Sequence, residues 1–196
     1  MSLWSQGSKS EMATHPPHLD IESLLAALAR HDVDFVLTGS VVGMALGVAH
    51  SPGDLDVAPA IDDANLGRLA GMLRALGAKP RHDPAWRRGL SEEGCERWAP
   101  DPPTGQNLDH RFVTRFGELD IVPLHAGTFD HLASHAVHVL AFGLPIRVAH
   151  PDDLIALCER WARETDRRRL PALRVAGEAL VRTGLPADIG ARLSRR

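Results

Sequence analysis

The sequence has few cysteines, no long apolar run and no excess of basic residues. Cys95 and Cys158 are its only cysteines and show no paired spacing, which argues against a disulfide framework and against a cysteine zinc site. No stretch is apolar enough to span a bilayer, and the first residues lack the apolar core of a signal peptide. The net charge of -3 argues against a nucleic-acid coat protein or a polybasic membrane binder. We therefore expect a cytoplasmic protein with no membrane partner.

The length and the composition along the chain predict one compact unit with a helical addition. The 196 residues can form one sizeable core. Residues 1–18 are polar and aperiodic, so we expect a disordered or expression-derived tail. Residues 19–150 are expected to form the main domain. Within it, 79–109 is expected to be a long loop insertion, because the apolar periodicity of helices and strands is absent from that segment. Residues 151–196 are expected to form a helical part packed on that domain.

Helical and strand-like apolar patterns alternate in the first half of the chain. Asp20 is a favourable N-cap for a helix that should end near residue 31, and residues 33–37 form a short apolar strand. Gly39 and Ser40 open the next helix, with Ser40 at its N-cap. A strand over 54–58 and a helix carrying the leucines of 66–76 should follow.

The second half of the chain shows two hairpins and then helices. Strands over 110–115 and 118–123 join around Phe116 and Gly117, and a second hairpin turns at Gly143. A helix starts near Pro151, and the last helix should run from about 171 to 182, after an arginine-rich stretch. The pattern predicts an α/β (α+β) fold, a short mixed β-sheet flanked by helices, with a helical C-terminal part.

Three acidic residues on predicted strands indicate a metal site. Side chains alternate along a strand, so Asp54 and Asp56 share one face while Leu55 and Val57 enter the core. Paired carboxylates repel each other unless a cation lies between them, and magnesium prefers such hard oxygen ligands. A further acid, Asp120, lies on a later strand. The alternative is a set of ordinary loop-edge acids on an unrelated α/β protein.

The order of these features resembles the nucleotidyltransferase superfamily, whose fold is that of the polymerase beta catalytic core. The resemblance rests on the apolar strand ending in Gly39-Ser40, the Asp-Leu-Asp-Val strand at 54–57 and the Glu-Leu-Asp-Ile-Val strand at 118–122. It covers most of the chain from about residue 20, including 152–173. Within the superfamily, the stretch looks like small bacterial AbiEii-like and minimal nucleotidyltransferases.

The resemblance implies a nucleotidyl transfer reaction and its metal ligands. Asp54 and Asp56 would hold two Mg²⁺ ions, and Asp120 would hold one of them while drawing the proton from the attacking hydroxyl. The substrate would be a nucleoside triphosphate such as ATP, and pyrophosphate would leave. Relatives modify transfer RNA, proteins or small antibiotics, and nothing in the sequence selects among these acceptors.

The resemblance also implies the residues that bind the nucleotide. Gly39 and Ser40 would grip the triphosphate, because a glycine lets the backbone approach the phosphates and a helix start offers unpaired N–H groups. Arg163 and Asp166 match part of a C-terminal family motif and would also bind the nucleotide.

The chain departs from the family at several basic positions. His50 stands where many relatives have an arginine, and Cys158 and Thr165 stand where lysines are common. The run Arg167–Arg169 can compensate, or it can be a solvated helix face. The departures favour an alternative, a weak or inactive protein of this fold that acts as a toxin–antitoxin or regulatory binding partner. A phosphate-handling hydrolase using the same acids is a further alternative.

Histidines and tryptophans outside these motifs have more than one interpretation. Trp86 and Trp98 can anchor the loop 79–109 by packing or can stack on a base or acceptor. His131 and His135 would share a helix face, which invites a zinc interpretation, but no cysteine or acid completes a recognisable set. We therefore interpret these two histidines, with His125 and His138, as surface residues.

Overall fold

The computed structural model describes residues 18–48, 51–86, 89–123, 129–184 and 188–194. Within these ranges one mixed sheet of seven strands forms the centre of the molecule, in the order β3-β4-β5-β2-β1-β7-β6. Its strands are β1 (Phe35–Thr38), β2 (Asp54–Pro59), β3 (Lys79–Pro80), β4 (Arg111–Thr114), β5 (Gly117–Ile121), β6 (Val137–Ala141) and β7 (Leu144–Val148). The mixed sheet confirms the predicted α/β class.

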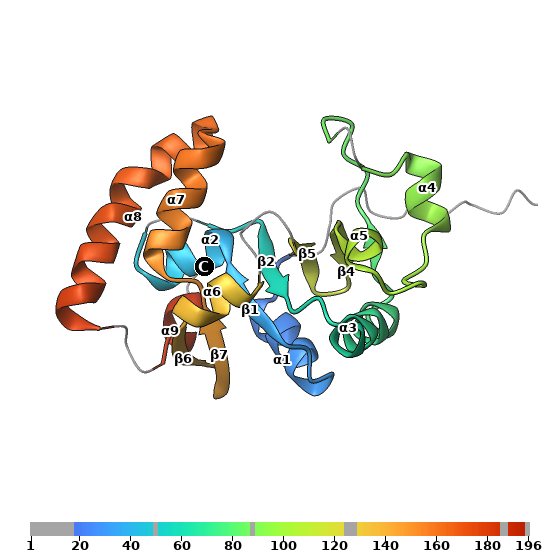
Figure 1. Ribbon diagram of the computed structural model, residues 1–196, viewed down its shortest axis with the longest axis horizontal. Coiled ribbons are helices and arrows are strands. Elements are labelled where there is room, and N and C mark those ends of the chain that lie inside the picture. The colour runs from blue at the N-terminus through green and yellow to red at the C-terminus, as the bar shows by residue number, and fades with distance from the viewer. Residues whose placement is uncertain (1–17, 49–50, 87–88, 124–128, 185–187, 195–196) are drawn as a thin grey trace, which may run out of the picture.

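Helices flank the sheet and form the C-terminal part of the chain. The helices are α1 (Ile21–Arg30), α2 (Gly39–Ala45), α3 (Asp63–Ala75), α4 (Glu92–Arg97), α5 (Gly105–Leu108), α6 (Phe129–His135), α7 (Pro151–Trp161), α8 (Glu164–Thr183) and α9 (Gly190–Leu193). In Figure 1 the pair α7 and α8 lies at one end of the molecule, and α3, α4 and α5 lie toward the other. None of the helices in the described ranges is long and apolar enough to cross a bilayer.

The centre of the sheet follows from the strand patterns. All four residues of β1 are buried, as expected of a short apolar strand with neighbours on both sides. In β2, Leu55 and Val57 are fully buried, whereas Asp54 and Asp56 on the other face are partly exposed. β2 pairs antiparallel with β1 and parallel with β5. The two acidic strands therefore lie side by side near the middle of the sheet.

The segment 79–109 contains more regular structure than its aperiodic sequence predicts. Lys79 and Pro80 pair with β4 as a two-residue edge strand, and α4 and α5 follow. Trp98 is buried, packs its ring 4.9 Å from that of Phe112 and donates an indole N–H bond to the carbonyl of Asn107. Short capped helices carry too few residues to show a period, so packing rather than pattern defines this segment.

Two helix starts differ from the predictions. The N-cap of α2 is Thr38 rather than Ser40, because Gly39, with a φ of +68°, already belongs to the helix. The last long helix, α8, begins at Glu164 rather than near Pro171, which lies inside it. The side chain of Asp166 accepts a hydrogen bond from the Arg163 backbone N–H and so caps this earlier start.

The end of the described chain returns to the sheet. Ile189 donates its backbone N–H to the carbonyl of Leu140 in β6 at 2.8 Å, and Asp188 forms a bridge with the same residue. Arg192 in α9 donates to the carbonyl of Ala45 in α2 at 2.8 Å. The helical C-terminal part is therefore tied both to the edge strand and to the helix that follows β1.

Candidate active site

The three predicted acids converge on one face of the sheet. Asp56 and Asp120 are register partners in the parallel pair of β2 and β5, and Asp54 lies two residues earlier on the same face of β2. One carboxylate oxygen from each lies within 4.8 Å of the others. The strand alternation predicted the first pair, and the pairing of β2 with β5 adds the third acid.

Burial and like-charge repulsion disfavour the charged forms of Asp56 and Asp120. Burial, and then the negative charges of Asp54 and Asp120, raise the pKa of Asp56 well above its usual range. Burial likewise raises the pKa of Asp120, although the neighbouring Arg111 opposes this effect. A bound cation relieves this repulsion, so the electrostatics fit a metal site.

Arg111 is a residue of the site that sequence reasoning missed. Its guanidinium lies 3.0 Å from an oxygen of Asp54 and 3.1 Å from one of Asp120, so it partly neutralises the acids. A signal was present in the sequence, because a hairpin that pairs Thr114 with Gly117 also pairs Arg111 with Asp120.

Glu118 also belongs to this face of β5 but not to the acidic cluster. Its side chain is 6% exposed and accepts a hydrogen bond from the Arg81 guanidinium at 2.6 Å, so Glu118 is a buried, paired acid rather than a solvated one. Because Arg81 satisfies Glu118, the three aspartates are the carboxylates left for metal binding at this place in the described structure.

Gly39 and Ser40 lie directly against Asp56. The backbone N–H of Ser40 donates to Asp56 Oδ2 at 3.3 Å. A Cβ built on Gly39 would lie 2.0 Å from that same oxygen, so only glycine fits at this contact. The hydroxyl oxygen of Ser40 is buried and has no hydrogen-bond partner within the described residues. An incoming polar group can satisfy it.

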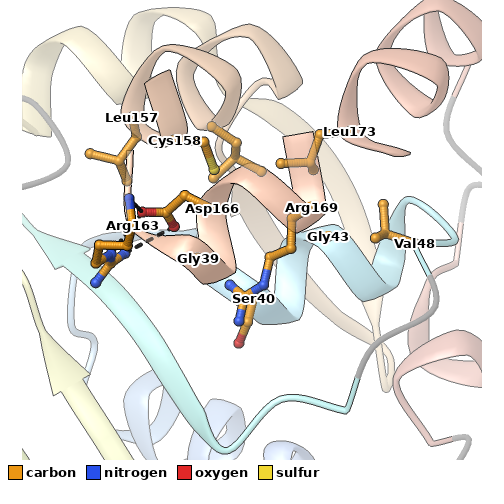
Figure 2. Close-up of a pocket in the computed structure, with 11 residues that line it drawn as sticks. Gly39, Ser40, Gly43, Val48, Leu157, Cys158, Arg163, Asp166, Arg169 and Leu173 are labelled. Atoms are coloured by element: carbon orange, nitrogen blue, oxygen red, sulfur yellow. Dashed lines mark hydrogen bonds and ion pairs between the residues drawn. The ribbon is translucent and has the colours of Figure 1, made fainter. Parts of the chain in front are cut away.

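A pocket of about 470 Å³, part of it open to solvent, lies between α2 and the α7–α8 pair. Gly39, Ser40, Gly43 and Val48 line one side. The opposite side consists of Leu154, Leu157, Cys158, Arg163, Asp166, Arg169 and Leu173 (Figure 2). The pocket thus meets the acidic cluster at Gly39 and Ser40, which contact Asp56.

Arg163 and Asp166 lie together at the start of α8. The guanidinium donates to both carboxylate oxygens of Asp166, at 2.7 and 3.2 Å, as the dashed lines in Figure 2 show. Asp166 is 2% exposed. The hydrogen bond to Asp166 raises the pKa of Arg163, which keeps its positive charge at the pocket wall. Asp166 therefore serves chiefly to cap α8 and orient Arg163.

Cys158, at one of the atypical positions, and Arg169 also line the pocket. Cys158 does so from α7, and burial raises the pKa of its thiol, which favours the neutral form; a thiol has no cationic form that could replace a lysine. Arg169, from the arginine run, lines the wall facing Ser40 (Figure 2). Arg168 instead pairs with Glu164 on the exposed side of α8. His50 lies outside the described residues.

The site can hold a divalent cation next to an anionic ligand. Three carboxylates with hard oxygen donors fit Mg²⁺, which is usually bound by a few carboxylates together with substrate phosphates. The Ser40 hydroxyl, which has no partner within the described residues, can receive an anionic ligand beside those carboxylates, together with the guanidinium groups of Arg163 and Arg169.

The comparisons with known proteins identify the fold. No protein-family model matches the chain, and no curated protein matches it significantly. A solution structure of the antibiotic-resistance factor ANT(2'')-Ia matches with a TM-score of 0.51 and 15% sequence identity, over 87% of each chain. A crystal structure of ANT(2'')-Ia in complex with adenylyl-2''-tobramycin matches with a TM-score of 0.50 and 13% identity, over 88% of this chain and 94% of that one. This chain therefore has the nucleotidyltransferase fold.

Proposed function

We propose that this protein is a metal-dependent nucleotidyltransferase that moves a nucleoside monophosphate from a nucleoside triphosphate to an acceptor hydroxyl. The acceptor oxygen forms a bond to the α-phosphorus, the bond to the pyrophosphate oxygen breaks, and pyrophosphate leaves. The observation that carries the proposal is the convergence of three carboxylates within 4.8 Å beside Gly39 and Ser40.

The carboxylates have distinct roles in this proposal. Asp54 and Asp56 would hold two Mg²⁺ ions, and Asp120 would hold one of them and accept the proton of the attacking hydroxyl. The bound ions would neutralise charge on the triphosphate and on the leaving pyrophosphate. Arg111 bridges Asp54 and Asp120 and fixes the position of both carboxylates.

Residues on both walls of the pocket bind the triphosphate. Gly39 lets the backbone come close to the phosphates. The Ser40 hydroxyl, which is buried and has no partner in the described structure, donates a hydrogen bond to a phosphate oxygen. Arg163 and Arg169 supply positive charge from α8. Arg169 thereby compensates for Cys158, which stands where relatives commonly carry a lysine.

For the acceptor we propose a small hydroxyl-bearing molecule of the aminoglycoside class. The support is the fold neighbour ANT(2'')-Ia, whose crystal structure contains adenylyl-2''-tobramycin. The net charge of -3 agrees with a cationic small acceptor better than with transfer RNA. The segment 79–109 is a candidate for acceptor selection, with Trp86 partly exposed in it.

The test is transfer of α-labelled nucleotide. The protein is incubated with each of the four labelled triphosphates, magnesium and an acceptor: tobramycin, bulk transfer RNA or a protein extract. We expect labelled tobramycin with at least one triphosphate, and none with Asp56→Asn. Label on RNA or protein alone would refute the acceptor class. Free labelled nucleoside monophosphate would instead indicate a hydrolase.

The alternative is a regulatory or toxin–antitoxin partner that keeps the fold without transfer. Cys158 in the pocket favours it, because the thiol cannot bind phosphate as a lysine would. Calorimetry with ATP, with and without magnesium, separates the two functions. Metal-dependent ATP binding supports the enzymatic function, whereas an absence of binding supports the regulatory partner.

The AbiEii-like type and the cytoplasmic location stay predictions.

A further inference from the structure

A second cluster of metal-binding side chains lies away from the acidic strands. His131 and His135 are one helical turn apart on α6, so both imidazoles project from the same face. Their rings meet edge to face, with centroids 4.7 Å apart. Leu132 between them is buried in the core and fixes the rotation of the helix. Both histidine side chains are therefore exposed and lie side by side on the surface of α6.

The structure adds the acid that the sequence did not reveal. Asp153, in the first turn of α7, lies 3.0 Å from His131 through its Oδ1 and the imidazole Nε2. One ligand atom from each of His131, His135 and Asp153 lies within 4.8 Å of the others. Asp153 lies 18 positions after His135 in the sequence, so no short spacing motif predicts this set. In Figure 1, α6 lies beside the lower end of α7.

Asp153 has unused binding capacity. Its side chain is 15% exposed. Its second oxygen, Oδ2, is fully buried and has no hydrogen-bond partner within the described residues. A buried carboxylate oxygen without a protein partner is costly, and a bound ion or water is a common explanation for such a group. An ordinary histidine–aspartate ion pair uses only Oδ1 and does not account for Oδ2.

We propose that His131, His135 and Asp153 bind a transition-metal ion, with zinc as the preferred ion. Two imidazole nitrogens and one carboxylate suit zinc and other divalent transition metals better than magnesium, which prefers oxygen ligands alone. Ligand atoms of a tetrahedral zinc site lie about 3.3 Å apart, given metal–ligand bonds of about 2 Å. The 3.0 Å contact between His131 and Asp153 is close to that spacing, and His135 needs only a small shift. A water takes the fourth position.

The site would join α6 to the helix that lines the nucleotide pocket. Leu154, directly after Asp153, and Cys158, one turn further, both line the pocket from α7. A metal held between α6 and the first turn of α7 fixes the start of that wall. The ion is thus structural and separate from the Mg²⁺ proposed at Asp54, Asp56 and Asp120.

The experiment titrates the full-length protein with Co²⁺ and Zn²⁺ in the presence of excess Mg²⁺. Tetrahedral Co²⁺ gives intense visible absorption bands, which octahedral oxygen sites do not. We expect one equivalent of Co²⁺ to produce these bands and Zn²⁺ to displace it. His135→Ala keeps the His131–Asp153 contact and should weaken Zn²⁺ binding about 100-fold. His138→Ala, an exposed histidine on β6, is the matched control and should bind as wild type.

Two further readouts separate this site from the acidic cluster. Asp56→Asn should leave the Co²⁺ bands and their stoichiometry unchanged, because it removes a ligand only from the acidic cluster. Zinc should raise the Tm of the wild type and of His138→Ala, but not of His135→Ala. Absent bands, equal zinc affinity in His135→Ala, or bands lost in Asp56→Asn would each overturn the proposal.

Discussion

Gly39 has the least freedom for substitution in the proposed active site. It adopts a φ of +68°, and a side chain there would collide with the carboxylate of Asp56. Gly39→Ala is expected to lower the free energy of unfolding by at least about 1–2 kcal/mol from the backbone conformation alone. It should also displace Asp56 and abolish magnesium-dependent ATP binding, measured by calorimetry.

Gly143→Ala is the matched control for this substitution. Gly143 has a φ of +74° in the turn between β6 and β7, but a Cβ there meets no atom within 4 Å. It should therefore carry the same backbone cost as Gly39→Ala and leave ATP binding intact. Equal ATP binding by the two variants would show that the contact between Gly39 and Asp56 has no part in the site.

Asp56 illustrates a conflict between stability and function. Its partly buried carboxylate lies beside those of Asp54 and Asp120, so the metal-free protein bears like-charge repulsion there. Asp56→Asn removes that repulsion, and we expect an unchanged or higher Tm without metal, by differential scanning fluorimetry. Nucleotide transfer should be lost. A large fall in Tm would mean instead that the charge of Asp56 is needed for folding.

Arg168 and Arg169, neighbours near the start of α8, have different surroundings. Arg169 lines the pocket, whereas Arg168 pairs with Glu164 on an exposed surface. Because charge-assisted hydrogen bonds contribute about 1.5–3 kcal/mol, Arg169→Ala should weaken ATP binding about tenfold or more. Arg168→Ala removes the same charge from the same helix and should change binding little. Equal effects would indicate a general electrostatic contribution instead of contact at the pocket.

At the scale of elements, periodic patterns predicted most helices and strands but not their packing partners. The helix after Asp20 and both hairpins are confirmed, because each has a capping residue or a turn with its own local signal. The predicted start of α8 was wrong, because Asp166 caps the helix at Arg163 and the helix continues through Pro171. The short helices of 79–109 had no periodic signal.

For the whole molecule, we expect magnesium and nucleotide to stabilise the protein together. The nucleotide contacts α2 and α8 in our proposal, so binding links the sheet to the C-terminal helices. ATP with Mg²⁺ at about 100 times its Kd should add about 2.7 kcal/mol to the free energy of unfolding. The check is a rise in Tm that EDTA cancels. A rise with ATP that EDTA leaves intact would contradict metal-dependent binding.

The candidate site was predictable in part. Strand alternation alone placed Asp54 and Asp56 on one face, whereas Asp120 joined them only through the family resemblance. A parallel pair such as β2 and β5 is formed by strands far apart in the chain, and no local pattern specifies it. For the same reason, the sequence did not show that Asp153 lies beside the histidines of α6.

Both borders of the sheet are poorly suited to recruiting another chain. At one border β3 consists of Lys79 and Pro80, too short and too polar to template a new strand. At the other border, Asp188 and Ile189 occupy part of β6 beside the exposed Leu140. Deleting residues 184–196 should therefore promote self-association, visible as larger species in size-exclusion chromatography. Another protein that binds the full chain would therefore have to dock through side-chain contacts rather than by adding a strand to the sheet.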